Sequence, residues 1–414
     1  MSVKYCKRCV YPSSSAIPLS FDENGICSGC RVHYQKDKID WQARGEQLRE
    51  IIEEYRVPDG SNYECIIPVS GGKDSWFQTY YVKEVLGLNP LLVTYNGNNY
   101  LPVGLRNMKR MREVFNVDHI FFTPGVEVLK KLNRLCFKKM GDMNWHNHAG
   151  IVTFPVQVAV KYKVPLIMWG EHGYVDMGGM FGMNDLIEMT AKHRLEHAMR
   201  GYDWFDMLDE NNPGMAEGIE AKDMQWCRYP TDDELESVDV RGLYLGNYVY
   251  WDANKQKDLM LTYGFEEAGF EFERTYRKFS NLDDIHENGM HDYMKFIKFG
   301  YGRASDHVSK DIRLNKITRE EGIELVRRYD HVKSRDLLRW LEYVDMDEDE
   351  FDAIADSFRD ARVWQKNDQG LWEKDDLWGG RSAYPVPRLT DMNLDWSDYR
   401  IDAPARPAMA TVPC

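Results

Sequence analysis

Short apolar runs alternate with longer segments through the first half of this chain, and that alternation constrains its fold more than any other feature. The runs cover residues 65–69, 91–95, 119–122 and 166–169, and the intervening segments are long enough for crossover helices. Apolar runs in this arrangement are typical of strands buried on both faces of a parallel sheet. The sequence therefore predicts an α/β fold built around a parallel sheet.

Four parts follow from the changes in composition along the 414 residues. Residues 1–39 form a polar, cysteine-containing module without an apolar core of its own. Residues 40–282 contain the α/β core, with a Met-rich, acidic helical insertion around 178–230 and a β-like run after it. Residues 283–360 are charged and helical, and residues 361–414 are expected to form an extended tail.

The net charge of −14 argues against nonspecific binding to nucleic acid, which depends on clustered Lys and Arg. No apolar run approaches the ~18–20 residues of a membrane span, and the N-terminus lacks the apolar segment of a signal peptide. We therefore expect a cytoplasmic protein that acts on a small molecule, without a membrane or nucleic-acid partner.

Two cysteine pairs near the N-terminus predict a structural zinc site. Cys6 and Cys9 are followed, after seventeen intervening residues, by Cys27 and Cys30. Two thiolate pairs on tight turns can complete a tetrahedral shell, and the bound ion would stabilise a module that has little core. An iron–sulfur cluster or a redox pair are the alternatives.

The loop after the first apolar run predicts a phosphate-binding site. Its sequence is Ser70, Gly71, Gly72, Lys73, Asp74, Ser75. Two glycines let backbone N–H groups close around an anion, and the N-terminus of the following helix adds the positive end of its dipole. It is not a Walker loop, because Asp74 stands where that motif has Ser or Thr. A glycine-rich turn with a helix cap is the alternative.

This loop resembles the S-G-G-x-D-S signature of the PP-loop ATP pyrophosphatases, such as asparagine synthetase, GMP synthetase and tRNA thiolases. The resemblance implies an adenine nucleotide alpha hydrolase-like core over residues 40–282 and cleavage of ATP into AMP and pyrophosphate. It also implies three roles: phosphate binding by Ser70, Gly71, Gly72 and Ser75, charge neutralisation by Lys73, and Mg²⁺ binding or loop ordering by Asp74.

Further candidate residues follow the other apolar runs. Tyr95 and Asn96 end the second run, where open α/β sheets bind nucleotides, so they could recognise adenine; a simple Asn-Gly turn is equally consistent. Glu171 follows the fourth run and is the best catalytic candidate, because it could bind Mg²⁺, orient ammonia or accept a proton.

Five side chains are candidates for proton transfer or substrate binding: His146, His148, His172, Tyr301 and Arg303. The histidines could instead be structural groups, which is more common than a second metal site. The arginine could bind a carboxylate or phosphate in bidentate fashion, although its glycine-flexed segment is also an ordinary helix-entry loop.

These motifs together resemble the N-acetyl sugar amidotransferase family over roughly residues 1–330. The likeness includes the cysteine pairs, the phosphate loop and segments 95–97, 169–171, 299–305 and 318–326. That family is associated with lipopolysaccharide, O-antigen and nonulosonic acid biosynthesis, where an acetamido group becomes acetamidino. Family members often carry a Cys-x-x-Cys pair at residues 144–147, which this chain lacks, so no role of that pair transfers.

The resemblance implies ATP and Mg²⁺ as cofactors and an N-acetyl sugar or its nucleotide-linked form as substrate. Cys65, Cys136 and Cys227 lie in no nucleophile setting, so a separate glutaminase subunit is expected to supply ammonia, with a synthase-like barrel subunit as a candidate conduit. Whether the chain forms a homo-oligomer stays open. Two other functions also stay open: a tRNA-modifying enzyme of the thiolase or lysidine synthetase type, and a non-catalytic nucleotide-binding module.

Overall fold

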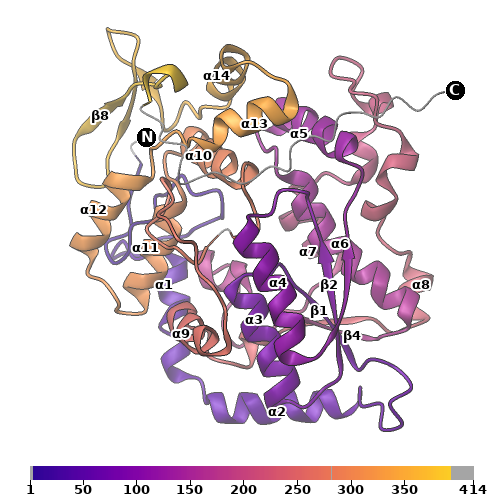
Figure 1. Ribbon diagram of the computed structural model, residues 1–414. Helices are drawn as coiled ribbons and strands as arrows, with labels where there is room; N and C mark the ends of the chain where they lie inside the picture. Colours follow the sequence, from indigo (N-terminus) through magenta and orange to yellow (C-terminus); the bar gives the residue numbers. More distant parts are fainter. Residues whose placement is uncertain (1–2, 281, 393–414) are drawn as a thin grey trace, which may run out of the picture.

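A five-stranded parallel sheet forms the centre of the computed structural model, which describes residues 3–280 and 282–392 (Figure 1). The strand order is β3-β2-β1-β4-β5. The strands are β1 (Cys65–Pro68), β2 (Pro90–Tyr95), β3 (Asp118–Phe122), β4 (Leu166–Trp169) and β5 (Arg241–Tyr244). The parallel sheet expected from the sequence is confirmed, and its first four strands coincide with the four apolar runs.

Both faces of this sheet are covered by helices, which explains why β1, β2 and β4 are buried along nearly their whole length, whereas the edge strand β3 is partly exposed. One face packs against α2 (Trp41–Glu53), α3 (Lys73–Tyr80), α4 (Pro102–Phe115) and α9 (Ala253–Tyr263). The other face packs against α6 (Trp145–Tyr162), and α5 (Val126–Met140) packs on α6. Because β1 pairs with both β2 and β4, the strand order reverses direction beside β1.

Residues 178–230, which were expected to form a helical insertion, consist mostly of short helices and helical turns. They contain α7 (Ala191–His193), η4 (Arg194–Ala198), η5 (Trp204–Met207), η6 (Asp209–Asn211) and η7 (Ala221–Cys227). The β-like run is shorter than expected, because β5 leads directly into the turn η8 (Leu245–Asn247). The other short elements are α1 (Ser28–His33), η1 (Lys36–Lys38), η2 (Tyr81–Val85), η3 (Tyr174–Gly178), α8 (Asp232–Glu236) and η9 (Leu389–Asp391).

The charged C-terminal segment folds into a group of helices with its own apolar cluster. Its elements are α10 (Glu287–Phe299), α11 (Arg303–Arg313), α12 (Arg319–Tyr329), α13 (Asp336–Val344) and α14 (Glu348–Ser357). A capping box begins α12, because Thr318 and Glu321 exchange side chain to backbone hydrogen bonds of 3.2 and 2.7 Å.

The segment expected to be an extended tail contains a small antiparallel sheet instead. Its strands are β6 (Gln365–Lys366), β7 (Trp372–Asp375) and β8 (Arg381–Tyr384). Aromatic packing holds it in place, because the rings of Trp364 and Tyr384 both lie 5.3 Å from that of Phe296 on α10. Residues 393–414 of the expected tail lie outside the described residues.

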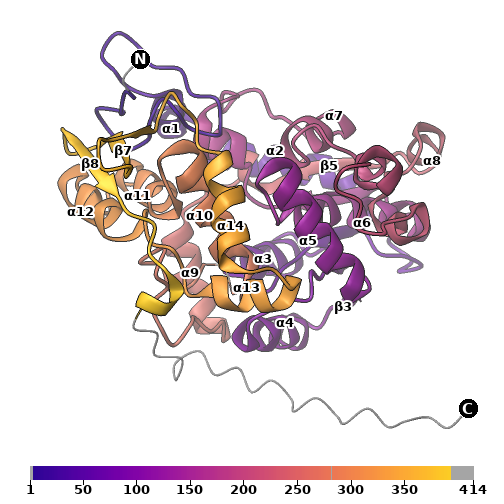
Figure 2. The ribbon, with the colours of Figure 1, turned by 90° about the horizontal axis from the view of Figure 1, so that it is seen from above.

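The N-terminal module, which contains α1, packs against α11 and α12 (Figure 2). The Tyr11 hydroxyl donates to Asp306 at 2.8 Å, and the Arg319 guanidinium donates to the Cys9 carbonyl at 3.2 Å. Within the part of the chain that the structure describes, we find no helix with the length and apolar character needed to cross a membrane.

Candidate functional site

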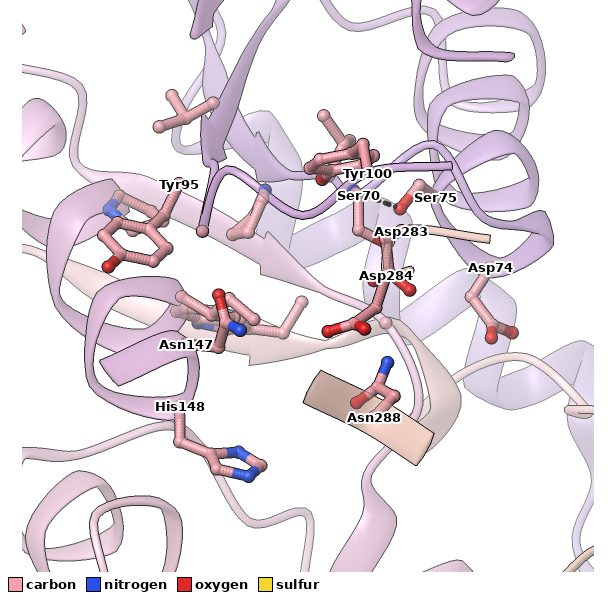
Figure 3. Close-up of a pocket in the computed structure, with 18 of the residues that line it drawn as sticks. Ser70, Asp74, Ser75, Tyr95, Tyr100, Asn147, His148, Asp283, Asp284 and Asn288 are labelled. Carbon is pink, nitrogen blue, oxygen red and sulfur yellow. Dashed lines mark hydrogen bonds between the residues drawn. The ribbon is translucent and has the colours of Figure 1, made fainter. Parts of the chain in front are cut away.

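A cavity of about 360 Å³ opens at the carboxyl ends of β1, β2 and β4 (Figure 3). This is the point where the strand order reverses, and open α/β sheets bind ligands in the crevice formed there. The cavity is lined by residues from the phosphate loop, the ends of β2 and β4, α6 and the segment before α10. Parts of the chain far apart in sequence therefore meet in one pocket.

The predicted phosphate loop connects β1 to α3 and lies along this cavity. Gly71 has a φ of +73°, and a Cβ atom there would lie 2.9 Å from the Gly104 carbonyl oxygen, so both backbone shape and space require glycine. The Ser70 backbone N–H donates to the Ser75 hydroxyl at 2.8 Å, which closes the loop (Figure 3). The buried Lys73 forms an ion pair with Asp74. The loop and the first turn of α3 thus present N–H groups suited to an anion.

Two carboxylates that the sequence analysis missed line the cavity near the loop. Figure 3 shows Asp283 beside Ser70 and Asp284 next to it. Asp284 accepts hydrogen bonds from the side chain of Asn99 at 2.6 Å and from the backbone N–H of Glu287 at 2.7 Å. Burial raises the pKa of Asp283 and of Asp284. With Asp74 they supply the oxygen donors that Mg²⁺ prefers.

Glu171 lines the same cavity and is paired with a lysine from α11. Its two carboxylate oxygens accept hydrogen bonds from Lys310 Nζ at 2.7 and 2.6 Å. Burial opposes ionisation of Glu171, but Lys310 and then Lys73 lower its pKa to about 2. A carboxylate with that pKa is a weak base at neutral pH, so of the roles expected for Glu171, binding a cation or orienting a substrate fits best.

Tyr95 lines the cavity. Asn96, which was expected to recognise adenine with it, and His146, a candidate for proton transfer or substrate binding, do not. Tyr95 hydrogen-bonds to His146 Nδ1 at 3.1 Å, and His146 Nε2 lies 2.9 Å from Glu287, where both side chains are fully buried. Asn96 donates to the hydroxyl of Thr123 at 2.8 Å. Its oxygen accepts from a backbone N–H two residues later, as in an ordinary Asx turn.

Three other predicted substrate-binding residues lie away from the cavity. His172 is buried against Tyr244, at 4.3 Å between ring centroids. Tyr301 packs in the cysteine cluster, and Arg303 forms ion pairs with Asp292 and with an aspartate on its own helix. Their side chains are held by packing and by internal partners. Of the five candidates, only His148 lines the cavity.

The four N-terminal cysteines form a cluster that could bind a zinc ion. Their Sγ atoms lie within 4.8 Å of one another, and all four side chains are fully buried. Backbone N–H groups of Cys9 and Cys27 donate to Cys6 Sγ at 3.5 and 3.3 Å. The Arg313 guanidinium lies 3.4 Å from Cys30 Sγ and 3.6 Å from Cys27 Sγ. Four converging sulfurs beside a cation match the donor set of a structural zinc site.

Comparison with known protein families places this geometry in a biosynthetic context. Residues 273–376 match a family model described as "LPS biosynthesis protein WbpG-like, C-terminal domain". The match supports a sugar or LPS biosynthesis family. The matched residues include Asp283 and Asp284 at the cavity, Lys310 beside Glu171, and Arg313 beside the cysteines. The match thus associates residues 273–376 with LPS biosynthesis.

An uncharacterized protein of Methanocaldococcus jannaschii is a curated relative. It is 26% identical over 113 residues, which is 27% of this chain and 40% of the relative. The chain therefore matches less than half of the length of that protein.

Proposed function

We propose that this chain is an ATP-dependent, AMP-forming amidotransferase that converts the acetamido group of an N-acetyl sugar into an acetamidino group during LPS biosynthesis. The observation that carries the proposal is the Ser70 to Ser75 loop, which lies between β1 and α3 beside a cavity at the reversal of strand order. The WbpG-like match supports the sugar substrate. A PP-loop core over residues 40–282 is part of this proposal.

The chemical difficulty of the reaction explains why ATP is needed. An amide carbonyl is a poor electrophile, and its oxygen is a poor leaving group. Attack of the amide oxygen on the α phosphate would give an O-adenylyl imidate and pyrophosphate, and ammonia would then displace AMP. The loop N–H groups and Lys73 would hold the β and γ phosphates.

Three carboxylates, Asp74, Asp283 and Asp284, would hold Mg²⁺, which supplies charge neutralisation on the departing pyrophosphate. Asp284 also accepts hydrogen bonds that order the start of α10, and Asp74 is paired with Lys73. The cavity wall would keep water away from the adenylate.

A separate glutaminase is part of this proposal. Burial raises the pKa of Cys65, of Cys136 and of Cys227, so each of these thiols is protonated and shielded from substrate. A thiol in that state is a poor nucleophile for glutamine hydrolysis. Ammonia would therefore come from another subunit.

The proposal is tested with purified protein, ATP, Mg²⁺ and ammonium chloride at alkaline pH, with and without a panel of N-acetyl sugars and their nucleotide-linked forms. We expect AMP and pyrophosphate only when a sugar is present. Release of AMP that depended on tRNA instead would replace the proposal by tRNA modification. Glutamine should not replace ammonium in the absence of a partner.

A further inference from the structure

His148 lines the cavity on the side away from the phosphate loop, and Asp142 and His291 lie beside His148 without lining the cavity themselves. Figure 3 shows His148 well separated from Ser70 and Ser75. His291 lies on α10 three residues after Asn288, which lines the cavity, so the two share one face of the helix. The imidazole rings of His148 and His291 are 5.5 Å apart.

Asp142 fixes the orientation and tautomer of His291. This carboxylate is almost fully buried in the connection between α5 and α6, and His291 Nδ1–H donates to its Oδ1 at 2.9 Å. Although burial opposes its ionisation, His291 and Arg200 hold the pKa of Asp142 well below its usual range. An ionised carboxylate accepts only, so the proton of a neutral His291 stays on Nδ1 and Nε2 keeps a free lone pair.

The charges around this cluster favour proton transfer over metal binding. The three ligand atoms lie within 4.8 Å of one another, which alone would suit a divalent cation. However, Arg200 Nε donates to Asp142 Oδ2 at 2.7 Å, and Lys298 Nζ donates to the carbonyl of Gly141 next to Asp142 at 3.0 Å. A divalent cation would have to enter beside both of these positive groups, at a high electrostatic cost.

His148 is held as a neutral imidazole by burial and, next, by the same arginine. Its Nε2 lies 3.5 Å from Arg200 Nη2, which donates to it. Burial and, next, the Arg200 guanidinium lower the pKa of His148 to about 3. Because Nε2 faces a donor, the proton of His148 lies on Nδ1. The charged or titratable groups around His291 are thus Asp142, His148, Arg200 and Lys298. Asp292, the next residue on α10, pairs instead with Arg274 and Arg303.

We infer that the Asp142–His291 pair, with His148 beside it, is a proton-transfer site for the nitrogen-transfer step. This inference rests on the proposed function. When ammonia adds to the adenylylated imidate, a C–N bond forms and the former amide nitrogen takes the electron pair of the C=N bond. His291 Nε2 removes one proton from the added nitrogen and returns it to the former amide nitrogen. The C–O bond then breaks, its electron pair leaves with AMP, and the product is an amidinium ion.

The tautomer of His291 can be tested without any substrate. In protein labelled with ¹⁵N-histidine, long-range proton–nitrogen spectra should show one histidine, identified by its loss in His291→Gln, with a protonated Nδ1 and a free Nε2. In Asp142→Asn, Arg200 should donate to the amide oxygen of the new side chain, and the NH₂ group should face His291. Nδ1 would then accept a hydrogen bond, so the imidazole proton should move to Nε2. A wild-type His291 protonated on Nε2 would overturn the inference.

The kinetic test separates the two half-reactions. His291→Gln should lower ammonia-dependent product formation by about 10²- to 10⁴-fold, the usual range for loss of a general acid or base. Sugar-dependent exchange between ATP and pyrophosphate, measured without ammonia, should change less than about threefold, since the loop contacts are intact. His197→Gln, on η4 and away from the cavity, is the matched control and should retain both activities.

The remaining outcomes distinguish this inference from the proposed function. If the wild type showed no sugar-dependent exchange, the proposed function would fail. If exchange occurred but His291→Gln transferred nitrogen normally, or lost both half-reactions equally, the proton-transfer inference alone would be wrong. A second equivalent of bound metal, lost in His291→Gln, would also overturn it in favour of a metal site.

Discussion

The cysteine cluster and the cavity are two polar sites built in opposite ways. The cluster takes all four of its sulfurs from residues 6–30, on two turns of one small module. The cavity takes its polar groups from the loop after β1, the ends of β2 and β4, α6 and the segment before α10. A site made from one segment depends on its ligands, whereas a site made from many segments depends on the packing that brings them together.

Helix α11 connects the two sites. Lys310 pairs with Glu171 at the cavity, and Arg313, three residues later, lies against the cysteine sulfurs. Arg313 also donates to the carbonyl of Asp176 at 2.6 Å, in the turn that follows Glu171. The cysteine module therefore helps to hold the helix that positions Glu171. The predictions below separate what each site contributes.

Loss of the cysteine ligands should have the largest effect on stability. In Cys9→Ser/Cys27→Ser we expect zinc content to fall from one equivalent to none and the N-terminal module to unfold, because structural zinc contributes on the order of 10 kcal/mol in small modules. Elemental analysis and proteolysis of residues 1–39 measure this. Cys136→Ala, outside the cluster, should keep its zinc. Wild-type protein purified without chelator and free of zinc would contradict this prediction.

Asp283→Asn should remove activity while leaving the fold intact. We expect AMP formation to fall by about 10²- to 10³-fold, as when one charge-stabilising group is lost from an active site. Stability should hold or rise, because burial disfavours the charged form of Asp283. Kinetics and thermal unfolding measure the two effects, and Asp258→Asn, on α9 away from the cavity, is the control. A normal rate of AMP formation in Asp283→Asn would show that this carboxylate takes no part in the reaction.

Arg313→Lys should weaken zinc binding without abolishing it. An ammonium group cannot contact several sulfurs and two backbone carbonyls at once as the guanidinium does. We expect zinc affinity to fall by about 10- to 100-fold, the usual cost of losing an outer partner of a metal ligand. Competition with a chromophoric chelator measures it, with Arg328→Lys as the control. An unchanged affinity for zinc would show that Arg313 does not support the zinc site.

Lys310→Met should lower the free energy of unfolding by a smaller amount, which depends on pH. The folded pKa of Glu171 is lowered from 4.5 to about 2, chiefly by Lys310 acting against burial. A lowered carboxylate pKa stabilises the fold above the unfolded pKa, and this stabilisation is lost as pH falls from about 4.5 towards 2. We expect Lys310→Met to be less stable by about 2–3 kcal/mol at pH 7 and the gap to close below pH 4. A gap independent of pH would contradict this.

The sequence predicts best those features whose pattern is local. Strands β1, β2 and β4 are mostly apolar because both of their faces are buried, and the loop and cysteines are recognised by their spacing. Asp283 and Asp284 could not be found this way, because they lie about 200 residues from the loop and only folding brings them to it. The pair of His291 and Asp142 is hidden for the same reason.

Tyr301 and Arg303 show the limit of a local pattern in a second way. An aromatic and an arginine beside glycines have the same local pattern whether their turn faces a ligand or the interior. Here the turn faces the interior, where Tyr301 packs on Tyr11 and Arg303 pairs with Asp292. A local motif therefore indicates the kind of side chain that is present but does not show which way it faces.

The position at which ATP is cleaved decides whether the loop from Ser70 to Ser75 works as proposed. Purified protein is incubated with ATP, Mg²⁺, ammonium and the sugar that stimulates turnover, and the phosphorus products are followed by ³¹P NMR. We expect AMP and pyrophosphate in equal amounts from the first turnover, since in the proposed function the loop would hold the β and γ phosphates while the α phosphate is attacked. ADP and orthophosphate as the primary products would contradict it.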